Sequence, residues 1–318
     1  MQAVWLREFG EPEVLTLGEA PDPVAGPGQV VVDVEFVNIT FVETQFRAGG
    51  PSPFTPTLPM IPGNGVGGVV ASVGPEVAPE LVGVRVVTST GGAGGYAERV
   101  AVDASAVFPV PDGVALDTAV ALLADGRTAT MMTRAAAVKP GERVLVEAAA
   151  GGVGSLIVQL AKAAGARVIA AVGGQRKAAV ATELGADVVV DYTDDGWPKR
   201  VRDTVGAVDV VFDGVGGVIA RAAFELLDRG GRMVSFGLAS GNWAEIGEDE
   251  AAARGVTLVR PSATPAELRA FTESALTEAA EGRLRPVVGQ RFPLGQAAKA
   301  HAAIQSRATV GKTLLETR

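Results

Sequence analysis

Residues 148–154, an unbroken run of small side chains, are the stretch of this sequence best suited to hold an anion. Aligned to the dinucleotide fingerprint Gly-x-Gly-x-x-Gly, the run has Ala149, Gly151 and Gly154 at the three glycine positions. Glycines let a pyrophosphate approach the backbone, and free amides at the start of a following helix favour its charge. A purely structural turn has the same composition, so the flanking residues must decide between the two.

Those flanking residues predict a strand, a turn, a helix and a second strand. Residues 144–146 are aliphatic, as in a strand buried on both faces. Apolar residues then repeat at three- and four-residue spacing through 156–164, and Gly165 stands where a left-handed helix cap is expected. Residues 168–172 complete a β-α-β unit of the length that dinucleotide-binding folds use.

The end of the second strand bears on which nicotinamide cofactor would bind. An NAD site places an acidic residue there, about twenty residues after the glycines, to bind the ribose hydroxyl. This chain instead has Gly173, Gly174, Gln175, Arg176 and Lys177. Two cations after two glycines favour a ribose 2′-phosphate and hence NADP. The alternative is a solvated first helical turn, although cations are mildly disfavoured at that end of a helix.

Composition limits the classes of function. The 318 residues predict about two domains, and the chain is 47% hydrophobic without an uncharged apolar run that could cross a bilayer. The first ten residues lack the pattern of a secretory signal. A net charge of −8 argues against a nucleic-acid partner. We therefore expect a cytoplasmic protein with no membrane or nucleic-acid partner.

The side chains of the usual metal sites are nearly absent. The sequence has no cysteine and one histidine, His301, so a zinc site of the Cys/His kind cannot form. A site of carboxylates alone stays open, although no acidic cluster indicates one. His301 lies in a helical pattern, which favours a surface or helix-packing histidine over a Ser-His-Asp triad. We expect no bound metal, and chemistry that comes mainly from a bound cofactor.

The remaining patterns predict two domains of different texture. Residues 1–120 are β-rich, with alternation in 30–37, 66–73 and 82–88 between turns rich in glycine and proline, as in an antiparallel or partly open barrel. From Asp117 onward, helices and strands alternate, beginning with a helix over 117–137 that is interrupted at 125–127.

Six strands alternating with helices predict a doubly wound parallel sheet over residues 121–263. The strands are expected at 144–146, 168–172, 188–192, 208–213, 232–237 and 256–259. Residues 264–318 break this rhythm and are expected to return to the first domain. The default substrate site is the cleft between the domains.

Seven motifs extend the comparison to a known family. They occupy residues 41–49, 94–98, 148–154, 211–216, 234–237, 260–262 and 300–309. In their order and spacing the chain resembles the zinc-free quinone oxidoreductases of the medium-chain dehydrogenase/reductase superfamily. The resemblance implies a Rossmann domain, a β-rich chaperonin-10-like catalytic domain, bound NADPH, and a homodimer built through the Rossmann sheets.

The resemblance also implies roles for individual residues along the cofactor. Gly151, Gly152, Val153 and Gly154 would line the pyrophosphate; Gly173, Lys177 and Tyr192, with Arg176, would surround the 2′-phosphate; Phe236 and Gly237 would lie along the cofactor, Thr128 near the nicotinamide, and Arg260 and Arg307 at the cleft. The alternatives are a core aromatic for Phe236 and surface charges for the two arginines.

Departures from the family pattern fall in the substrate pocket. Thr40 stands where the family commonly has an asparagine beside the nicotinamide, and two common pocket tyrosines fall at Gln45 and Pro51. Asp125 replaces a lysine. We therefore expect hydride transfer from NADPH to an electron-poor acceptor, such as a quinone, an enone or an enoyl thioester.

In this hypothesis Thr40 and Thr128 donate hydrogen bonds to an enolate, and Asp125 relays a proton if burial raises its pKa. The alternative for Asp125 is a carboxylate paired with Arg127 or facing solvent. A different class of function, an NADPH-binding sensor or structural protein without catalysis, also stays open. The strand at 256–259 would lie at the sheet edge, which predicts a homodimer with a continuous sheet.

Overall fold

The computed structural model describes residues 1–50 and 57–318. Its internal contacts divide the chain into a first unit, Met1–Ala124 with Leu276–Arg318, and a second unit, Asp125–Ala275. The sequence analysis placed these limits at 121 and 264. Helices α2 (Leu116–Ala136) and α8 (Pro265–Ala280) span the two limits, because each contributes residues to both units.

The second unit is built on a six-stranded sheet with the order β10-β9-β8-β11-β12-β13. All neighbouring strands are parallel. The strands are β8 (Arg143–Glu147), β9 (Arg167–Val172), β10 (Val188–Asp191), β11 (Val208–Asp213), β12 (Leu227–Ser235) and β13 (Thr257–Val259). The strand order reverses between β8 and β11, which confirms the predicted doubly wound fold.

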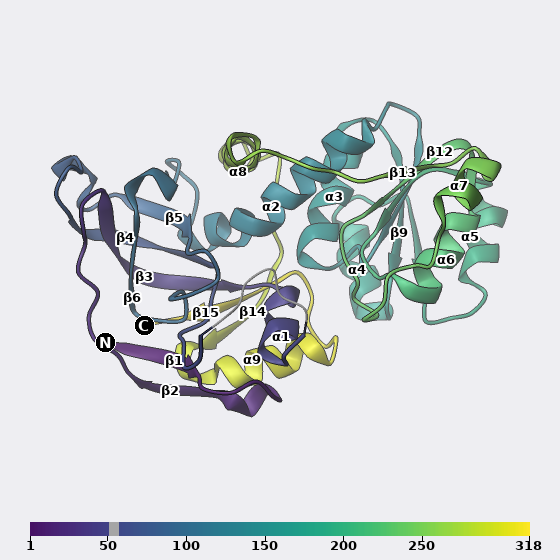
Figure 1. Cartoon of the computed structure of the whole chain (residues 1–318). Helices are drawn as coiled ribbons and strands as arrows, with labels where there is room; N and C mark the ends of the chain where they lie inside the picture. Colours follow the sequence, from purple (N-terminus) through teal and green to yellow (C-terminus); the bar gives the residue numbers. More distant parts are fainter. Residues whose placement is uncertain (51–56) are drawn as a thin grey trace. The chain divides into compact units, whose positions relative to one another are not determined.

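Helices cover both faces of this sheet (Figure 1). Helices α3 (Gly152–Ala163) and α4 (Gln175–Glu183) lie on one face, and α5 (Trp197–Val205), α6 (Gly217–Glu225) and α7 (Glu248–Arg254) lie on the other. The predicted cap is confirmed, since Gly165 follows α3 with a φ of 80°. Because both faces are covered, the central strands are apolar and fully buried, as Val144, Leu145 and Val146 are.

The predicted interruption of the helix at 125–127 is wrong. Helix α2 runs unbroken from Leu116 to Ala136. Gly126 lies buried in its middle, where a glycine costs about 1 kcal/mol relative to alanine. Packing of the flanking apolar residues, among them the fully buried Leu122 and Ala129, outweighs that propensity.

The first unit is a mainly antiparallel β structure. Its larger sheet has the order β14-β15-β3-β4-β5-β7, and β6 also pairs with β3. The strands are β3 (Gln29–Ile39), β4 (Gly65–Val73), β5 (Arg85–Ser89), β6 (Arg99–Asp103), β7 (Val107–Pro109), β14 (Val288–Pro293) and β15 (Lys312–Glu316). Strand β15 pairs antiparallel with β3, and the part of the C-terminal segment that belongs to this unit is Leu276–Arg318.

Short elements complete the first unit. Strands β1 (Gln2–Leu6) and β2 (Leu15–Glu19) form a separate antiparallel pair, and helices α1 (Phe41–Arg47) and α9 (Ala297–Gln305) pack together. Single 3₁₀ turns occur at Pro12–Val14, Pro79–Leu81, Ala104–Ala106 and Leu294–Gln296. In the part of the chain that the structure describes, no helix has both the length and the hydrophobicity needed to cross a bilayer.

Candidate functional site

The glycine turn between β8 and α3 forms a cradle at the carboxyl end of the sheet. Ala148 has a left-handed φ of 48°, and its carbonyl accepts a hydrogen bond from the Gly151 amide at 2.8 Å. A Cβ atom on Gly154 would lie 2.9 Å from the carbonyl carbon of Ala148 and would overlap its oxygen. Glycine is therefore required at 154 for the helix to start this close to the strand.

The amides at the start of α3 are oriented for an anion. Ser155 donates the first helical hydrogen bond, to the Gly151 carbonyl at 2.9 Å. The amides of residues 152–154 come before this bond, so they belong to the set that a helix leaves without partners of its own. These amides and the helix dipole favour a bound anion, and the chemistry of the cradle fits a pyrophosphate.

Asp125 lies against this turn. A Cβ atom on Gly152 would come within 2.9 Å of the Asp125 Cγ, so the carboxylate contacts the first residue of α3. Asp125 is 8% exposed, which rules out the solvent-facing alternative. Burial lowers the pKa of Arg127, and the charge of Asp125 opposes that shift. The carboxyl group of Asp125 therefore lies at a helix N-terminus, where negative charge is favoured.

The turn after β9 brings together two of the predicted phosphate-site residues, Gly173 and Tyr192. A Cβ atom on Gly173 would lie 3.2 Å from the Tyr192 ring and 3.3 Å from its hydroxyl, so Tyr192 covers Gly173. Arg176 and Lys177 lie in the first turn of α4, where Arg176 is exposed and Lys177 half-buried. The structure thus brings Gly173 and Tyr192 together and places both cations one turn further along the chain.

Asp191, to which the sequence analysis gave no role, secures this turn. Burial would raise the pKa of Asp191, but hydrogen bonds from Thr193 and the Gly174 amide lower it overall. The Thr193 hydroxyl donates to Asp191 at 2.7 Å. An acidic residue at the end of an apolar strand was the available signal, and its role depends on the neighbouring turn.

Phe236 and Gly237 meet the loop that follows β11. A Cβ atom on Gly214 would lie 2.6 Å from the Phe236 ring, and one on Gly237 would lie 2.8 Å from the Gly214 carbonyl oxygen. The Phe236 amide donates to the Asp213 carbonyl at 2.8 Å. Phe236 is half-buried, so part of its ring surface stays open to a ligand.

Two buried acids below these loops were also missed by the sequence analysis. Glu147 ends β8, Asp213 ends β11, and both are 0% exposed. They lie where the strand order reverses, which is the point where open α/β sheets bind ligands. Charged residues closing two otherwise apolar strands were the signal, but their proximity follows only from the pairing of strands distant in sequence.

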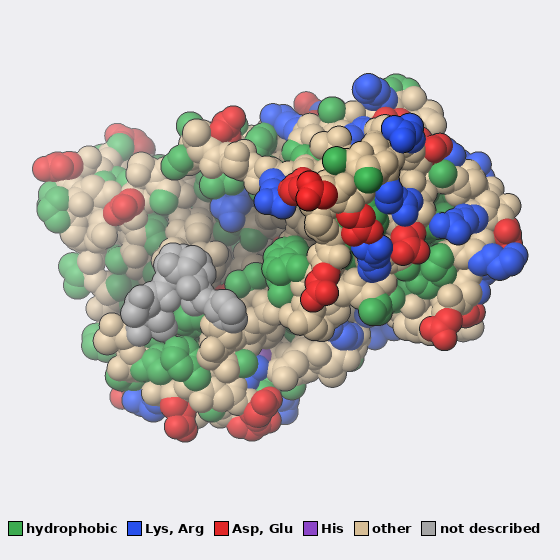
Figure 2. Space-filling model, turned by 45° about the vertical axis from the view of Figure 1, so that its right-hand side comes forward, with side chains coloured by type: hydrophobic (Ala, Val, Ile, Leu, Met, Phe, Trp, Pro, Cys, Tyr) green, Lys and Arg blue, Asp and Glu red, His purple; other side chains and the backbone are tan. Residues whose placement is uncertain are grey.

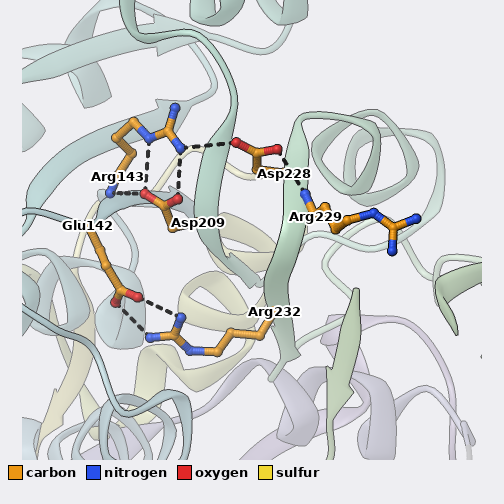
Figure 3. A network of polar contacts seen from close by, with 6 residues as sticks. All are labelled: Glu142, Arg143, Asp209, Asp228, Arg229 and Arg232. Atoms are coloured by element: carbon orange, nitrogen blue, oxygen red, sulfur yellow. Dashed lines mark hydrogen bonds and ion pairs between the residues drawn. The ribbon is translucent and has the colours of Figure 1, made fainter. Parts of the chain in front are cut away.

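At the amino end of the same strands, acids pair with arginines instead (Figure 3). Arg143 donates to Asp209 at 2.7 and 3.0 Å, and Arg232 donates to Glu142 at 2.7 and 2.9 Å. Hydrogen bonds from Arg232 lower the pKa of Glu142, and those from Arg143 lower the pKa of Asp209. This network satisfies its own charges and has the character of a structural ion-pair cluster.

In the first unit, Thr40 joins a partly buried polar network. The Glu43 carboxylate accepts hydrogen bonds from the Thr40 amide at 2.6 Å, the Thr40 hydroxyl at 2.8 Å and the Asn64 amide at 3.2 Å. Burial raises the pKa of Glu43, although these donors and the charge of Lys312 oppose the rise. The hydroxyl proton of Thr40 is therefore directed at Glu43.

His301 packs inside the first unit, as one of its two predicted alternatives stated. It is 1% exposed, and its Nε2 lies 2.8 Å from the hydroxyl of the buried Tyr96. Burial lowers the pKa of His301 to about 3, so the imidazole is neutral at physiological pH. A neutral, enclosed imidazole suits packing rather than nucleophilic catalysis.

The two predicted cleft arginines lie in different units. The Arg307 guanidinium lies 4.2 Å from the centre of the Phe41 ring in the first unit, and Arg307 has a left-handed φ of 61°. In the second unit, Arg260 is exposed and pairs with Glu248 at 2.6 Å. Thr128 lies half-buried in the part of α2 that belongs to the second unit.

The pocket positions that depart from the family pattern are only partly described. Gln45 lies half-buried in α1, and Pro51 falls outside the described residues. Of the predicted site residues, Thr40 and Arg307 belong to the first unit and all others to the second.

Charge and metal-ligand patterns give no sign of other site types. Figure 2 shows acidic and basic side chains interspersed over the visible face, without a continuous basic surface. Among the described residues, no group of three or more histidine, cysteine, aspartate or glutamate side chains is placed to hold a metal ion.

Comparisons with known proteins extend this geometry. A family model described as a zinc-binding dehydrogenase matches residues 152–273, and one described as an alcohol dehydrogenase GroES-like domain matches residues 26–112. A doubly wound sheet with a glycine cradle at its switch point, together with a GroES-like unit, defines a medium-chain dehydrogenase/reductase.

Individual relatives narrow the class. The chain is 35% identical to a probable quinone oxidoreductase of Schizosaccharomyces pombe, over 98% of this chain and 96% of that protein. The structure of an Escherichia coli quinone oxidoreductase complexed with NADPH matches with a TM-score of 0.90 and 32% identity, over 99% of this chain and 100% of that chain. A structure titled NAD-dependent alcohol dehydrogenase matches with a TM-score of 0.89 and 32% identity, over 100% of both chains. The chain belongs to the quinone oxidoreductase family.

Proposed function

We propose that this protein is an NADPH-dependent oxidoreductase that transfers a hydride to an electron-poor small molecule, a quinone or an activated alkene such as an enone or enoyl thioester. The observation that carries the proposal is the glycine cradle at the start of α3, in a chain that is similar to quinone oxidoreductases over nearly its whole length. Bound NADPH supplies the hydride, and the protein supplies position and electrostatics.

The residues for holding NADPH come mainly from the second unit. The amides of Gly152, Val153 and Gly154, with Gly151 before them, would bind the pyrophosphate. Lys177, with Arg176, Gly173 and Tyr192, would bind the 2′-phosphate; Phe236, Gly237 and Thr128 would lie along the nicotinamide half, and Arg260 and Arg307 would contribute charge. The half-buried Phe236 and the Tyr192 ring over Gly173 support these assignments.

Thr40 and Glu43 would manage the proton that follows the hydride. Thr40 donates its hydroxyl proton to Glu43, so it can donate to a product oxyanion only when Glu43 carries a proton and donates to Thr40 in turn. Burial raises the pKa of Glu43 and so favours that protonated form. Thr40→Val should therefore lower turnover about tenfold or more while the NADPH affinity stays unchanged. An equal loss in both would contradict this role.

Asp125 can relay a proton only if its carboxylate moves away from the glycine turn or passes the proton on through the residues of that turn. Asp125→Asn preserves the shape and removes the charge beside Gly152. A relay predicts a loss of turnover, whereas a carboxylate that only caps the turn predicts a change in NADPH affinity. Rapid-mixing kinetics combined with NADPH titration separates these outcomes.

The proposed enzyme works without zinc. This expectation rests on the absence of cysteine and the single, buried histidine. The purified protein should retain its activity in a chelator and contain no stoichiometric zinc by elemental analysis. About one tightly bound zinc ion per chain would overturn it.

A panel of acceptors tests the reaction itself. NADPH oxidation is expected with quinones or activated alkenes, and little or no oxidation of ethanol or secondary alcohols, because a chain with no cysteine and one histidine cannot form the usual zinc site that would polarise an alkoxide. Efficient alcohol oxidation would place the protein with its alcohol dehydrogenase neighbour. Tight NADPH binding without turnover of any acceptor would favour the non-catalytic sensor or structural protein.

The proposed assembly is a homodimer. Strand β13 (Thr257–Val259) is an edge strand of the six-stranded sheet, and its outer hydrogen-bonding groups can pair with a second copy across a two-fold axis. Light scattering at micromolar concentration should give twice the mass of one chain. A monomer would contradict this assembly.

A further inference from the structure

Glu147 and Asp213 form a pair of buried acids at the switch point of the sheet. Strands β8 and β11 are parallel neighbours, with Val146 opposite Phe212. Glu147 and Asp213 are the next residues of the two strands, and both are fully buried. Two negative charges on neighbouring strands of a dry interior are strongly unfavourable unless one of them is neutralised.

The two carboxyls together hold the loop between β11 and α6. The Val215 amide donates to Glu147 Oε2 at 3.2 Å and to Asp213 Oδ1 at 3.1 Å, and the Gly216 amide donates to Asp213 Oδ1 at 2.8 Å. From β12, the Ser235 hydroxyl donates to Asp213 Oδ2 at 2.7 Å. Both oxygens of Asp213 thus accept hydrogen bonds.

Glu147 has the surroundings of a protonated carboxyl. Its Oε1 is fully buried and has no hydrogen-bond donor. Burial, followed by the charge of Asp213 and a hydrogen bond to it, raises the pKa of Glu147 well above its ordinary value, although the Val215 and Gly214 amides oppose the rise. Among the described residues, no cation forms an ion pair with either carboxyl. A proton on Glu147, donated to Asp213, removes the repulsion between two buried carboxylates.

The loop that the pair holds supports the predicted cofactor residues. Gly214 packs directly under the Phe236 ring, and Gly216 has a φ of 75° with the Asn242 backbone so close that no side chain fits. A shift of this loop therefore displaces Phe236. A second negative charge would also develop at the same end of the sheet as the glycine cradle, whose chemistry favours an anion.

We propose that Glu147 is a positioning residue for the dinucleotide: the proton that it shares with Asp213 fixes the loop at 214–216 beneath Phe236 and keeps this pair of carboxyls to a single negative charge. The inference rests on the proposed function, because it assigns the loop and Phe236 to the NADPH site. Deprotonation of Glu147 weakens NADPH binding by repelling Asp213, displacing the loop and adding charge near the phosphates.

NADPH titration by fluorescence over a range from neutral to alkaline pH tests the proposal. The wild-type affinity should fall by about tenfold as Glu147 loses its proton, which corresponds to about 1.4 kcal/mol. Glu147→Gln keeps the shape, still accepts from Val215 and can donate its amide to Asp213 without titrating. The Glu147→Gln variant should bind NADPH as tightly as the wild type at neutral pH, and its affinity should not fall at alkaline pH. Glu142→Gln, at the other end of β8, is the matched control and should retain the fall.

The unfolding of the cofactor-free protein gives a readout that is independent of NADPH. Because the folded-state pKa of Glu147 is raised, its contribution to stability is fully present below the unfolded pKa and is lost as pH rises through the folded pKa. In Glu147→Gln, the free energy of unfolding should no longer fall as pH rises through this range. If no NADPH binding is found for the wild-type protein, the proposed function fails, whereas this unfolding profile still reports on the pair.

Asp213→Asn removes the same pair from its other side and serves as the second variant. A folded variant of either kind that keeps the wild-type alkaline fall in affinity overturns the proposal. If neither variant folds at neutral pH, the pair is a folding determinant rather than a positioning device, and the proposal is likewise rejected.

Discussion

The two ends of strands β8 and β11 use the same acidic residue types in opposite ways. At the amino end, Asp209 and Glu142 each face an arginine and accept two hydrogen bonds from its side chain (Figure 3). At the carboxyl end, Glu147 and Asp213 face each other and accept hydrogen bonds from loop amides. The amino end is satisfied by its own charges, whereas the carboxyl end needs a proton.

The difference separates stability from function within one sheet. Opposite charges at the amino end stabilise the folded state, and because they pair with one another they offer a ligand few groups to bind. At the carboxyl end, the fold keeps two acids, strained glycine turns and the first amides of α3 together, although an apolar core would cost less free energy. Such unfavourable arrangements concentrate at functional sites, and this is where open α/β sheets bind their ligands.

The largest effect that sharpens this comparison is expected from Gly154→Ala. The new Cβ would overlap the Ala148 carbonyl, which is backbone and cannot move aside. We expect a loss of about 3 kcal/mol in the free energy of unfolding, as for severe overpacking, together with loss of NADPH binding. Denaturant unfolding and fluorescence titration measure the two effects.

Gly247→Ala is the matched control, because a Cβ there meets nothing within 4 Å. It should leave the NADPH affinity unchanged and lower the free energy of unfolding by no more than about 1 kcal/mol, because Gly247 is the N-cap of α7. Unimpaired stability and binding in Gly154→Ala would show that the cradle geometry is not required.

Arg143→Ala should affect the amino end alone. It removes the two hydrogen bonds to Asp209 and leaves a partly buried carboxylate, so the free energy of unfolding should fall by about 2 kcal/mol. The NADPH affinity should remain unchanged. If Arg143→Ala folds but binds NADPH much more weakly, the amino end also contributes to ligand binding, and the proposed division between the two ends is contradicted.

A smaller effect is expected from acid. Hydrogen bonds from Arg143 lower the pKa of Asp209 in the folded state, so their contribution to stability is present above the unfolded pKa and is lost as pH falls through the folded pKa. The stability difference between wild type and Arg143→Ala should therefore shrink on acidification, by about 1 kcal/mol for a pair that is partly exposed. Unfolding at a series of pH values measures this, and a constant difference would contradict the assignment.

The sequence predicted the elements of the second unit well because their signals are local. Apolar runs, the three- and four-residue spacing after Gly154 and the cap at Gly165 all lie within single elements. The interruption predicted at 125–127 failed because burial of Gly126 in α2 depends on tertiary packing, which outweighs helix propensity.

The acid pair could not be predicted for a related reason. Glu147 and Asp213 are 66 residues apart in sequence, and only the register of β8 against β11 brings them together. Asp191 and Glu43 were missed similarly, since each acts on a turn or a residue that the strand pattern does not describe. Periodicity identifies strands, but the neighbours of a strand end follow from sheet order.

The central claim is that the carboxyl end of this sheet, with the first turn of α4, binds NADPH. Lys177→Ala tests it most directly. Charge-assisted hydrogen bonds contribute about 1.5–3 kcal/mol, so the NADPH affinity should fall about ten- to a hundredfold. The NADH affinity should change little, because NADH has no phosphate there. Removing Arg176 as well should reduce the preference for NADPH over NADH further. The reduction should be smaller than the sum of the two single-variant effects.

Lys162→Ala supplies the matched control, since it removes the same charge from α3 but breaks only a surface pair with Asp187. Both affinities should be unchanged in that variant. The decisive measurement is the titration of Lys177→Ala with NADPH and NADH side by side. The account predicts a selective loss for NADPH, and an equal change in both affinities would place the phosphate site elsewhere.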